Sequence, residues 1–287
     1  MNALSADLDP RLTPARPDLA ARHLEGVVRA ERFVSGTLHR VIRPSAPVRA
    51  RPDPTASLVT EALFGETVTV FETTIEGWAW GQLDADGYVG WLPSEALAET
   101  ALAPTHKVGA LRTPVFPGPS IKLPPMELLS FGSRLRIVGT RERFAVTEEG
   151  MFVFAAHLAP LAAFEPDVVA VAARFLGAAY LWGGRSSLGL DCSGLVQVAL
   201  AACGIRCPRD SDMQEKAIGR DIGFSGDMAE LRRGDLLYWP GHVGIVEDGA
   251  SLLHATAHFM SVVCEPLDAA LARICASGTA LRSVRRL

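Results

Sequence analysis

The sequence predicts an α+β fold, with two small β-barrels in front of a domain in which a helix packs on an antiparallel sheet. Three observations support this prediction. Residues 35–99 contain short β-like runs separated by turn residues, which is typical of a small barrel. Residues 100–162 repeat the same order more weakly. Residues 163–287 contain an apolar helical run, followed by two β-branched runs that a turn connects.

The first segment, residues 1–34, is polar and contains Pro10, Pro14 and Pro17. We interpret it as an arm that packs on the domains and expect a short helix over 17–32; the alternative is a solvated surface segment. Acidic residues stand near the start of the chain, where a secretory signal would carry a basic segment and an apolar core. A cytoplasmic protein is therefore expected.

The first barrel is predicted from β-like runs that alternate with turn residues. These runs are 41–42, 48–50, 58–63, 67–71, 78–83 and 87–92. In the second barrel, Phe131-Gly132 stands where Phe64-Gly65 stands in the first, and strand-like residues follow in both. Residues 160–166 are the expected linker, and 167–177 are the helix expected to open the last domain.

Cys192 is the candidate nucleophile, because it begins an apolar helical run directly after a glycine-rich polar loop. The run 192–202 contains no proline, and Gly204 stands where a left-handed helix end is expected. Asp191 is the expected N-cap, which places the thiol near the positive end of the helix dipole. A helix N-terminus and a neighbouring imidazolium can lower a thiol pKa by several units from about 8.5, so a thiolate is expected. The alternative is an inert buried cysteine.

Two histidines flank a predicted hairpin. A three-residue loop at 247–249 would pair Val246 with Ala250 and place His242 directly opposite His254, with Cβ atoms about 5 Å apart. A two-residue loop would put the histidines on opposite faces, so the prediction depends on the register. In the first register His242 is the general base and His254 orients it. The alternatives are a surface histidine at 242 and a structural core histidine at 254.

These residues resemble the NlpC-type cysteine peptidases, which cut bacterial cell-wall peptides. The resemblance covers about 166–287 and rests on Asp191-Cys-Ser-Gly, Gly241-His-Val-Gly-Ile-Val and the second histidine. Tyr180-Leu-Trp-Gly-Gly and Pro208-Arg-Asp-Ser-Asp-Met-Gln make the sequence similar to the γ-D-glutamyl-L-diamino acid endopeptidases of the dipeptidyl-peptidase VI type. The resemblance implies a papain-like peptidase domain preceded by barrels of the bacterial Src-homology-3 type.

The resemblance also implies roles for residues around the nucleophile. Tyr180 is expected in the oxyanion region, where it would act with the backbone N–H of Cys192; the alternative is plain aromatic packing. Asp191, Ser193 and Trp182 are expected to bind substrate, although Trp182 also fits a turn and core plug.

A further set is implied to hold the free amine of the substrate's N-terminal L-Ala. Asp210 and Ser211 are the main candidates, since a carboxylate suits an ammonium group; the alternative is a simple N-cap pair. Tyr88 matches the barrel tyrosine that closes over the same end. The acid that the family often carries before the barrel's Phe-Gly turn aligns with Val59, and Glu61, expected on the same strand face, is the candidate replacement.

The implied reaction is hydrolysis of an amide by acyl transfer through Cys192. The implied substrate is a murein-derived peptide beginning L-Ala-γ-D-Glu-diamino acid, in recycling of free peptides, since the barrels would exclude the intact sacculus. An amidase or acyltransferase with another acyl group, and an idle wall-binding module, are the alternatives. No cofactor is expected. No metal is expected either, because Cys203 and Cys207 lack a second matching pair downstream for a zinc site.

Composition limits the partners. The net charge of −4 leaves no basic face, so neither nucleic acid nor an anionic membrane is an expected partner. No apolar stretch is long enough for a transmembrane helix. The five cysteines form an odd set, which favours a reducing compartment over a disulfide framework. Nothing in the sequence indicates the oligomeric state.

Overall fold

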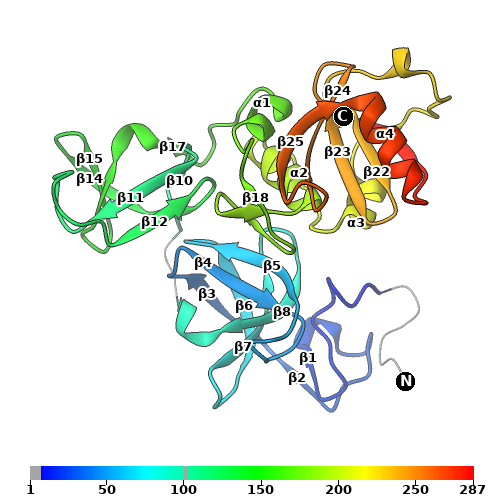
Figure 1. Ribbon diagram of the computed structural model, residues 1–287. Coiled ribbons are helices and arrows are strands. Elements are labelled where there is room, and N and C mark those ends of the chain that lie inside the picture. The colour runs from blue at the N-terminus through cyan, green and yellow to red at the C-terminus, as the bar shows by residue number, and fades with distance from the viewer. Residues whose placement is uncertain (1–7, 100–102) are drawn as a thin grey trace. The chain divides into compact units, whose positions relative to one another are not determined.

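The computed structural model describes residues 8–99 and 103–287 (Figure 1). The chain divides into two compact units, Met1–Leu161 and Ala162–Leu287. Residues 1–7 of the predicted arm and residues 100–102 at the predicted start of the second barrel lie outside the described residues.

The arm forms two short strands, so the predicted helix over 17–32 is wrong. Strand β1 (Leu19–Ala21) leads into a 3₁₀ turn, η1 (Arg22–Leu24), and pairs in parallel with β2 (Arg32–Val34). Gly26 interrupts the segment with φ +82°, a left-handed conformation that ends a helix. The extended path buries all three residues of β1, whereas a single helix would have turned part of this run toward solvent.

Residues 37–99 form one antiparallel sheet in the order β5-β4-β8-β7-β6-β3-β9. Buried residues alternate along β4, β6 and β8, because one face of each strand points into a common core. The predicted runs 58–63 and 78–83 match the observed strands residue for residue. The elements are β3 (Thr37–Val41), β4 (Ser45–Arg49), β5 (Leu58–Leu63), β6 (Thr67–Thr73), β7 (Trp78–Leu83), β8 (Val89–Pro93), η2 (Ser94–Ala96) and β9 (Leu97–Glu99).

Residues 106–160 repeat this order of elements. Their strands form antiparallel sheets in the orders β13-β10-β17 and β12-β11-β16-β15-β14. The same turn recurs: Gly65 (φ +75°) donates its N–H to Val41 at 2.8 Å, and Gly132 (φ +84°) donates to Val108 at 2.9 Å. The elements are β10 (His106–Val108), β11 (Arg112–Phe116), β12 (Glu127–Ser130), β13 (Arg134–Leu135), β14 (Ile137–Arg141), β15 (Phe144–Thr147), β16 (Phe152–Phe154), η3 (Ala155–His157) and β17 (Leu158–Pro160).

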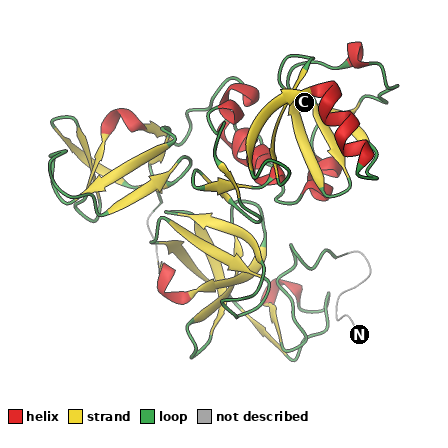
Figure 2. Cartoon of the chain, viewed as in Figure 1, coloured by secondary structure: helices red, strands yellow, loops and turns green. Residues whose placement is uncertain are grey.

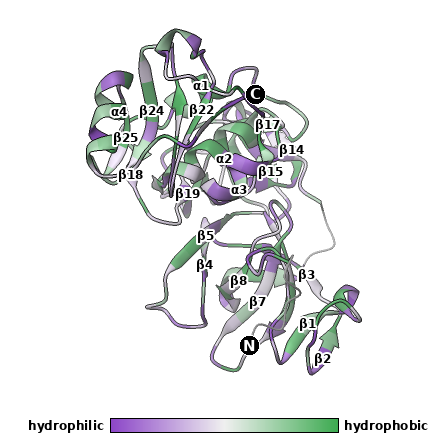
Figure 3. Cartoon of the chain, turned by 90° about the vertical axis from the view of Figure 1, so that its right-hand side faces the viewer, coloured by the Kyte–Doolittle hydropathy of each residue, from purple (hydrophilic) through white to green (hydrophobic). Residues whose placement is uncertain are grey.

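The second unit contains a sheet, yellow in Figure 2, with helices beside it in red. Its strand order is β19-β20-β18-β25-β24-β23-β22-β26-β21. Its strands are β18 (Ala179–Tyr180), β19 (Arg185–Ser186), β20 (Gly189–Leu190), β21 (Arg220–Asp221), β22 (Leu236–Trp239), β23 (His242–Val246), β24 (Ser251–Thr256), β25 (Ser261–Pro266) and β26 (Ser283–Arg286). Strand β22 is apolar in Figure 3 and buried along its whole length, which places it in the core.

Helices complete this unit. They are α1 (Val168–Ala173), α2 (Cys192–Ala202), α3 (Ser211–Ala217) and α4 (Leu267–Ala276), with a 3₁₀ turn, η4 (Met228–Glu230). Helix α4 packs on the sheet through Leu267, Ala270 and Ile274, which share one apolar cluster with Val246 and Leu252. Helix α2 contacts β23 and β24. The two helices and these central strands surround the candidate site.

Candidate active site

Cys192 is the first residue of α2, and the observed helix has the bounds that the sequence predicts. Asp191 is the N-cap, and its Oδ1 accepts the N–H of Gly194 at 2.7 Å. The predicted helix end is also confirmed, because Gly204 adopts φ +81°. Local sequence therefore places the thiol in the first turn of α2.

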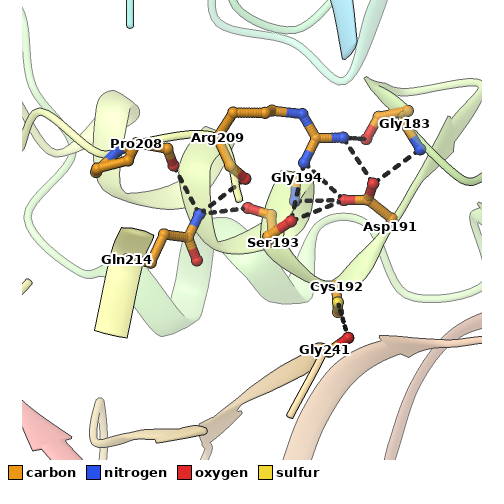
Figure 4. A network of polar contacts seen from close by, with 10 residues as sticks. Gly183, Asp191, Cys192, Ser193, Gly194, Pro208, Arg209, Gln214 and Gly241 are labelled. Carbon is orange, nitrogen blue, oxygen red and sulfur yellow. Dashed lines mark hydrogen bonds and ion pairs between the residues drawn. The ribbon is translucent and has the colours of Figure 1, made fainter. Parts of the chain in front are cut away.

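Behind the thiol, the Asp191 carboxylate is held by a buried arginine that the sequence interpretation missed (Figure 4). Arg209, 1% exposed, donates from Nη1 to Oδ1 at 2.9 Å and from Nη2 to Oδ2 at 2.7 Å. The Gly183 N–H also donates to Oδ2, and Ser193 Oγ accepts a third bond from Arg209 at 2.9 Å. Substrate binding by the Asp191 and Ser193 side chains does not fit this geometry, because both are buried and bonded within the protein.

The loop before α3 is tied to α2 by Gln214. Its Nε2 donates to the Ser193 carbonyl at 2.9 Å and to the Pro208 carbonyl at 2.8 Å (Figure 4). Asp210 occupies the N-cap position of α3, but its side chain makes no capping hydrogen bond. Asp210 and Ser211 are both partly exposed, so the simple N-cap interpretation does not account for Asp210.

His242 and His254 lie on one face of the hairpin as predicted, but the predicted register is wrong. The ladder pairs Val246 with Leu252, and Glu247 still donates its N–H to Ser251 at 2.8 Å. The loop is therefore 248–250, one residue later than predicted. A shift of this kind moves the partner by two residues, which preserves the face and makes His242 and His254 diagonal neighbours.

The two imidazoles are in direct contact. His242 Nε2 and His254 Nδ1 are 2.8 Å apart. The other ring nitrogen of His242, Nδ1, takes no part in this contact. His254 Nε2 lies 2.8 Å from Oε1 of Glu265 on β25, and Arg273 of α4 pairs with the same oxygen. Neither Glu265 nor Arg273 was anticipated from the sequence, because β25 and α4 carry no motif. Strand β25 reaches the site by pairing with β24, and α4 reaches it by packing on the sheet.

The electrostatics of the thiol contradict the expected low pKa. Cys192 is 6% exposed, and burial together with the Asp191 charge raises its pKa to about 11, against the lowering effect of the Val243 and Ser193 N–H groups. Its Sγ lies 3.9 Å from the Gly241 carbonyl oxygen. Burial likewise lowers the pKa of His242 to about 3 and that of His254 to about 4. At neutral pH these shifts favour the uncharged forms of Cys192 and of both histidines.

Tyr180 and Trp182 differ in exposure. Tyr180 is half-buried on β18, and burial, followed by the charges of ionised Cys192 and Asp191, raises its pKa. Its hydroxyl therefore stays protonated and can donate a hydrogen bond. Trp182 is 66% exposed, so it is no core plug, and its ring is available to a ligand.

The remaining candidates belong to the first unit. Tyr88, 5% exposed, is part of the barrel core, and Glu61 on β5 is 7% exposed. Val59 packs against the same core. A β-bulge between the pairs Val48–Thr60 and Arg49–Leu58 leaves Val59 as the extra residue. The expectation that Val59 and Glu61 share a strand face fails, because a bulge interrupts the two-residue alternation.

Within residues 8–99 and 103–287, no group of three or more histidine, cysteine, aspartate or glutamate side chains is arranged to hold a metal ion. In the same part of the chain, no helix is both long and apolar enough to cross a membrane.

Comparisons with known proteins agree with the geometry. A family model described as the bacterial dipeptidyl-peptidase Sh3 domain matches residues 48–97, and the NlpC/P60 family model matches residues 177–273. The chain is 29% identical over 251 residues to dipeptidyl-peptidase 6 of Lysinibacillus sphaericus, covering 79% of this chain and 91% of the relative. It is 30% identical over 220 residues to γ-D-glutamyl-L-lysine dipeptidyl-peptidase of Bacillus subtilis, covering 68% of this chain and 71% of the relative.

The fold has a close counterpart among solved structures. The crystal structure of an NlpC/P60 family protein from Bacillus cereus matches with a TM-score of 0.71 and 20% identity, covering 87% of this chain and 99% of that one. Sequence, fold and the Cys–His geometry thus agree, and the chain belongs to the NlpC/P60 family as a cysteine peptidase.

Proposed function

We propose that the enzyme hydrolyses the γ-D-glutamyl–diamino acid bond of murein-derived peptides that begin with a free L-Ala. The observation that carries this proposal is Cys192 at the start of α2, near a paired His242 and His254 in the same unit. The relatives named for cleavage at γ-D-glutamyl-L-lysine support the choice of bond. Free peptides are the proposed substrates, in recycling of cell-wall material.

The proposed mechanism begins from the neutral pair. Nδ1 of His242 takes the thiol proton as Cys192 Sγ attacks the γ-carbonyl carbon. The Tyr180 hydroxyl and the Cys192 N–H donate hydrogen bonds to the oxyanion. The His242 imidazolium then protonates the departing amine, and a water molecule that His242 deprotonates releases the acyl group from the thioester.

The substrate's free amine is proposed to bind Asp210 and Ser211 at the start of α3. A partly exposed carboxylate at the start of α3 suits an ammonium group through a charge-assisted hydrogen bond. Such a contact would hold the N-terminus of the peptide so that the scissile bond follows its second residue. We also propose that residues 103–160 are a second barrel of the bacterial Src-homology-3 type, which the recurrence of the Gly65 turn at Gly132 supports.

The amine contact is tested with a pair of tripeptides, L-Ala-γ-D-Glu-L-Lys and its N-acetyl form. Acetylation removes the charge and should lower kcat/KM by an amount equivalent to about 1.5–3 kcal/mol, the usual contribution of a hydrogen bond to a charged group. Asp210→Asn should erase most of this difference, whereas Asp212→Asn, two residues further along α3, should leave it unchanged. Cys192→Ala should show no turnover of either peptide.

Equal rates on the free and acetylated peptides would refute the amine specificity and leave a general Cys–His amidase. Turnover by Cys192→Ala would refute the nucleophile itself.

A further inference from the structure

Three side chains form a diagonal row on one face of the sheet in the second unit. His254 pairs across β25 with Val263, and Leu252 pairs with Glu265, so Glu265 is the diagonal neighbour of His254. His242 is the diagonal neighbour of His254 on the other side. The row runs His242, His254, Glu265, and Arg273 of α4 pairs with Glu265 at its end. Helix α4 packs on this face against Leu252 of β24.

The hydrogen bonds along the row determine where the protons are. An ionised carboxylate only accepts, so His254 Nε2 must carry a proton toward Glu265 Oε1. Burial keeps His254 neutral by lowering its pKa, so its Nδ1 carries no proton and must accept from His242. His242 therefore has its proton on Nε2, and its Nδ1 presents a lone pair. This is the tautomer that a base acting on the Cys192 thiol requires.

Arg273 gives the carboxylate a second partner on the same oxygen. Its guanidinium lies 5.5 Å from the centre of the Phe259 ring, and its side chain is 28% exposed, against 12% for Glu265. Unpaired, the Glu265 charge would favour imidazolium at both histidines. The Arg273 charge opposes this and lowers the pKa of His242 and of His254.

We propose that Glu265 and Arg273 are positioning residues for the general base: the carboxylate sets the tautomers of His254 and then His242, while the guanidinium cancels its charge. The proposal rests on the proposed Cys–His chemistry. It adds a role for β25 and α4, which contribute nothing to the nucleophile. The charged and titratable groups around the base are His254 from β24, Glu265 from β25 and Arg273 from α4. Cys192 from α2 joins them, since its Sγ lies 3.9 Å from the carbonyl oxygen of Gly241, the residue before His242.

The tautomers can be read without any substrate. In the full chain labelled with ¹⁵N-histidine, nitrogen chemical shifts should show protonated Nε2 and bare Nδ1 at both His242 and His254. Glu265→Gln should keep this pattern, because Arg273 holds the amide oxygen in place of the carboxylate oxygen. Glu265→Ala should give mixed tautomers at both rings. An unchanged pattern in Glu265→Ala would overturn the proposal even if the peptidase activity were confirmed.

Turnover of the tripeptide gives a second readout. Glu265→Ala should lower kcat by about 10²-fold with little change in KM, less than the roughly 10⁴-fold loss when a directly orienting residue imposes the wrong tautomer. Glu265→Gln should stay within about threefold of the unaltered enzyme, since it retains the acceptor. Equal losses in the two variants would indicate packing alone and would overturn the proposal.

The role of the Arg273 charge is tested on the acid side of the pH profile of kcat/KM. The histidine nitrogen chemical shifts follow the same titration. Arg273→Met should move the acid limb of the profile to higher pH by about one unit, because the carboxylate is no longer neutralised. Glu265→Gln should move it to lower pH, and the double variant should lie near the unaltered enzyme. Shifts of the same sign in both single variants would overturn the role of Arg273.

The matched control is an ion pair elsewhere in the same unit. Arg174 lies 2.7 Å from Glu165 and both are about one-third exposed, at 36% and 31%. Glu165→Gln and Arg174→Met should change neither the tautomers nor the pH limb. Absence of turnover in the unaltered enzyme, with the predicted tautomers present, would refute the proposed function and leave the positioning role standing.

Discussion

At the residue scale, burial outweighs the charges near the nucleophile. The helix N-terminus and the Val243 and Ser193 N–H groups favour a Cys192 thiolate, yet burial and Asp191 raise its pKa to about 11. The pKa of His242 is shifted in the opposite direction, downward, because burial disfavours its cationic form. We therefore expect the thiolate to form during attack, with His242 receiving the proton, rather than to exist beforehand as an ion pair.

The neutral pair predicts a broad pH profile. The pKa of His242 is lowered to about 3, so the base stays unprotonated well below the usual histidine range, and the pKa of Cys192 is raised to about 11, so the thiol keeps its proton in mild alkali. We expect kcat/KM on L-Ala-γ-D-Glu-L-Lys to be flat from about pH 5 to about pH 9. Circular dichroism at each pH separates titration from unfolding. An acid limb near 6.5 in the folded enzyme would contradict the neutral pair.

At the element scale, the start of α2 is held by an ion pair between segments distant in sequence. Asp191 alone caps the helix, but its carboxylate also receives the Gly183 N–H and both Nη groups of Arg209. The glycine-rich loop, α2 and the segment before α3 are thereby joined at one carboxylate. This junction holds the first turn of α2, where Cys192 lies.

Removing the arginine should destabilise the second unit strongly. Arg209→Met leaves the Asp191 charge without its buried cation, and breaking such a pair costs about 3–5 kcal/mol of the free energy of unfolding. Urea unfolding of the full chain measures this loss. Arg206→Met, an exposed arginine three residues earlier, should change stability by less than about 0.5 kcal/mol. A small change in Arg209→Met would mean that the network contributes little to holding α2.

The hairpin shows how much of an element sequence can predict. The face shared by His242 and His254 follows from residue parity, and both possible three-residue loops preserve it. The register does not follow, because Gly249 can occupy the second loop position at φ +88° as well as the third. The hydrogen bond from the Glu247 N–H to Ser251 establishes the observed register, which can be read only from the folded sheet.

At the scale of the whole molecule, each unit has its own core, and the arm belongs to the first. The Arg11 carbonyl accepts the Val89 N–H at 2.8 Å, and Leu12 packs against the barrel core. The Arg16 guanidinium lies 4.3 Å from the centre of the Trp80 ring and 4.9 Å from that of Trp91. The arm is thus an integral part of the barrel surface, as the sequence suggested, although the helix predicted within it does not form.

Arg16 should therefore contribute to the stability of the first unit. It stacks on two aromatic rings and pairs with Glu72, so Arg16→Ala should lower the free energy of unfolding by about 1–2 kcal/mol. Tryptophan fluorescence during urea unfolding, to which Trp80 and Trp91 contribute, reports the change. Arg51→Ala, at an exposed site on the same barrel, is the control and should have no effect. Matching midpoints for the two variants would show that the arm is only loosely attached.

The sequence by itself determined the features that depend on local propensity and side-chain periodicity. These include most strands of the first barrel, the helix 192–202, its Asp191 cap and the common face of the two histidines. The tertiary structure alone decided the strand register, the arrival of Glu265, and the buried partner Arg209. The physical reason is that strand register and buried side-chain partners depend on which distant segments of the chain pack together. The pKa shifts of Cys192 and the histidines depend on how much water this packing excludes.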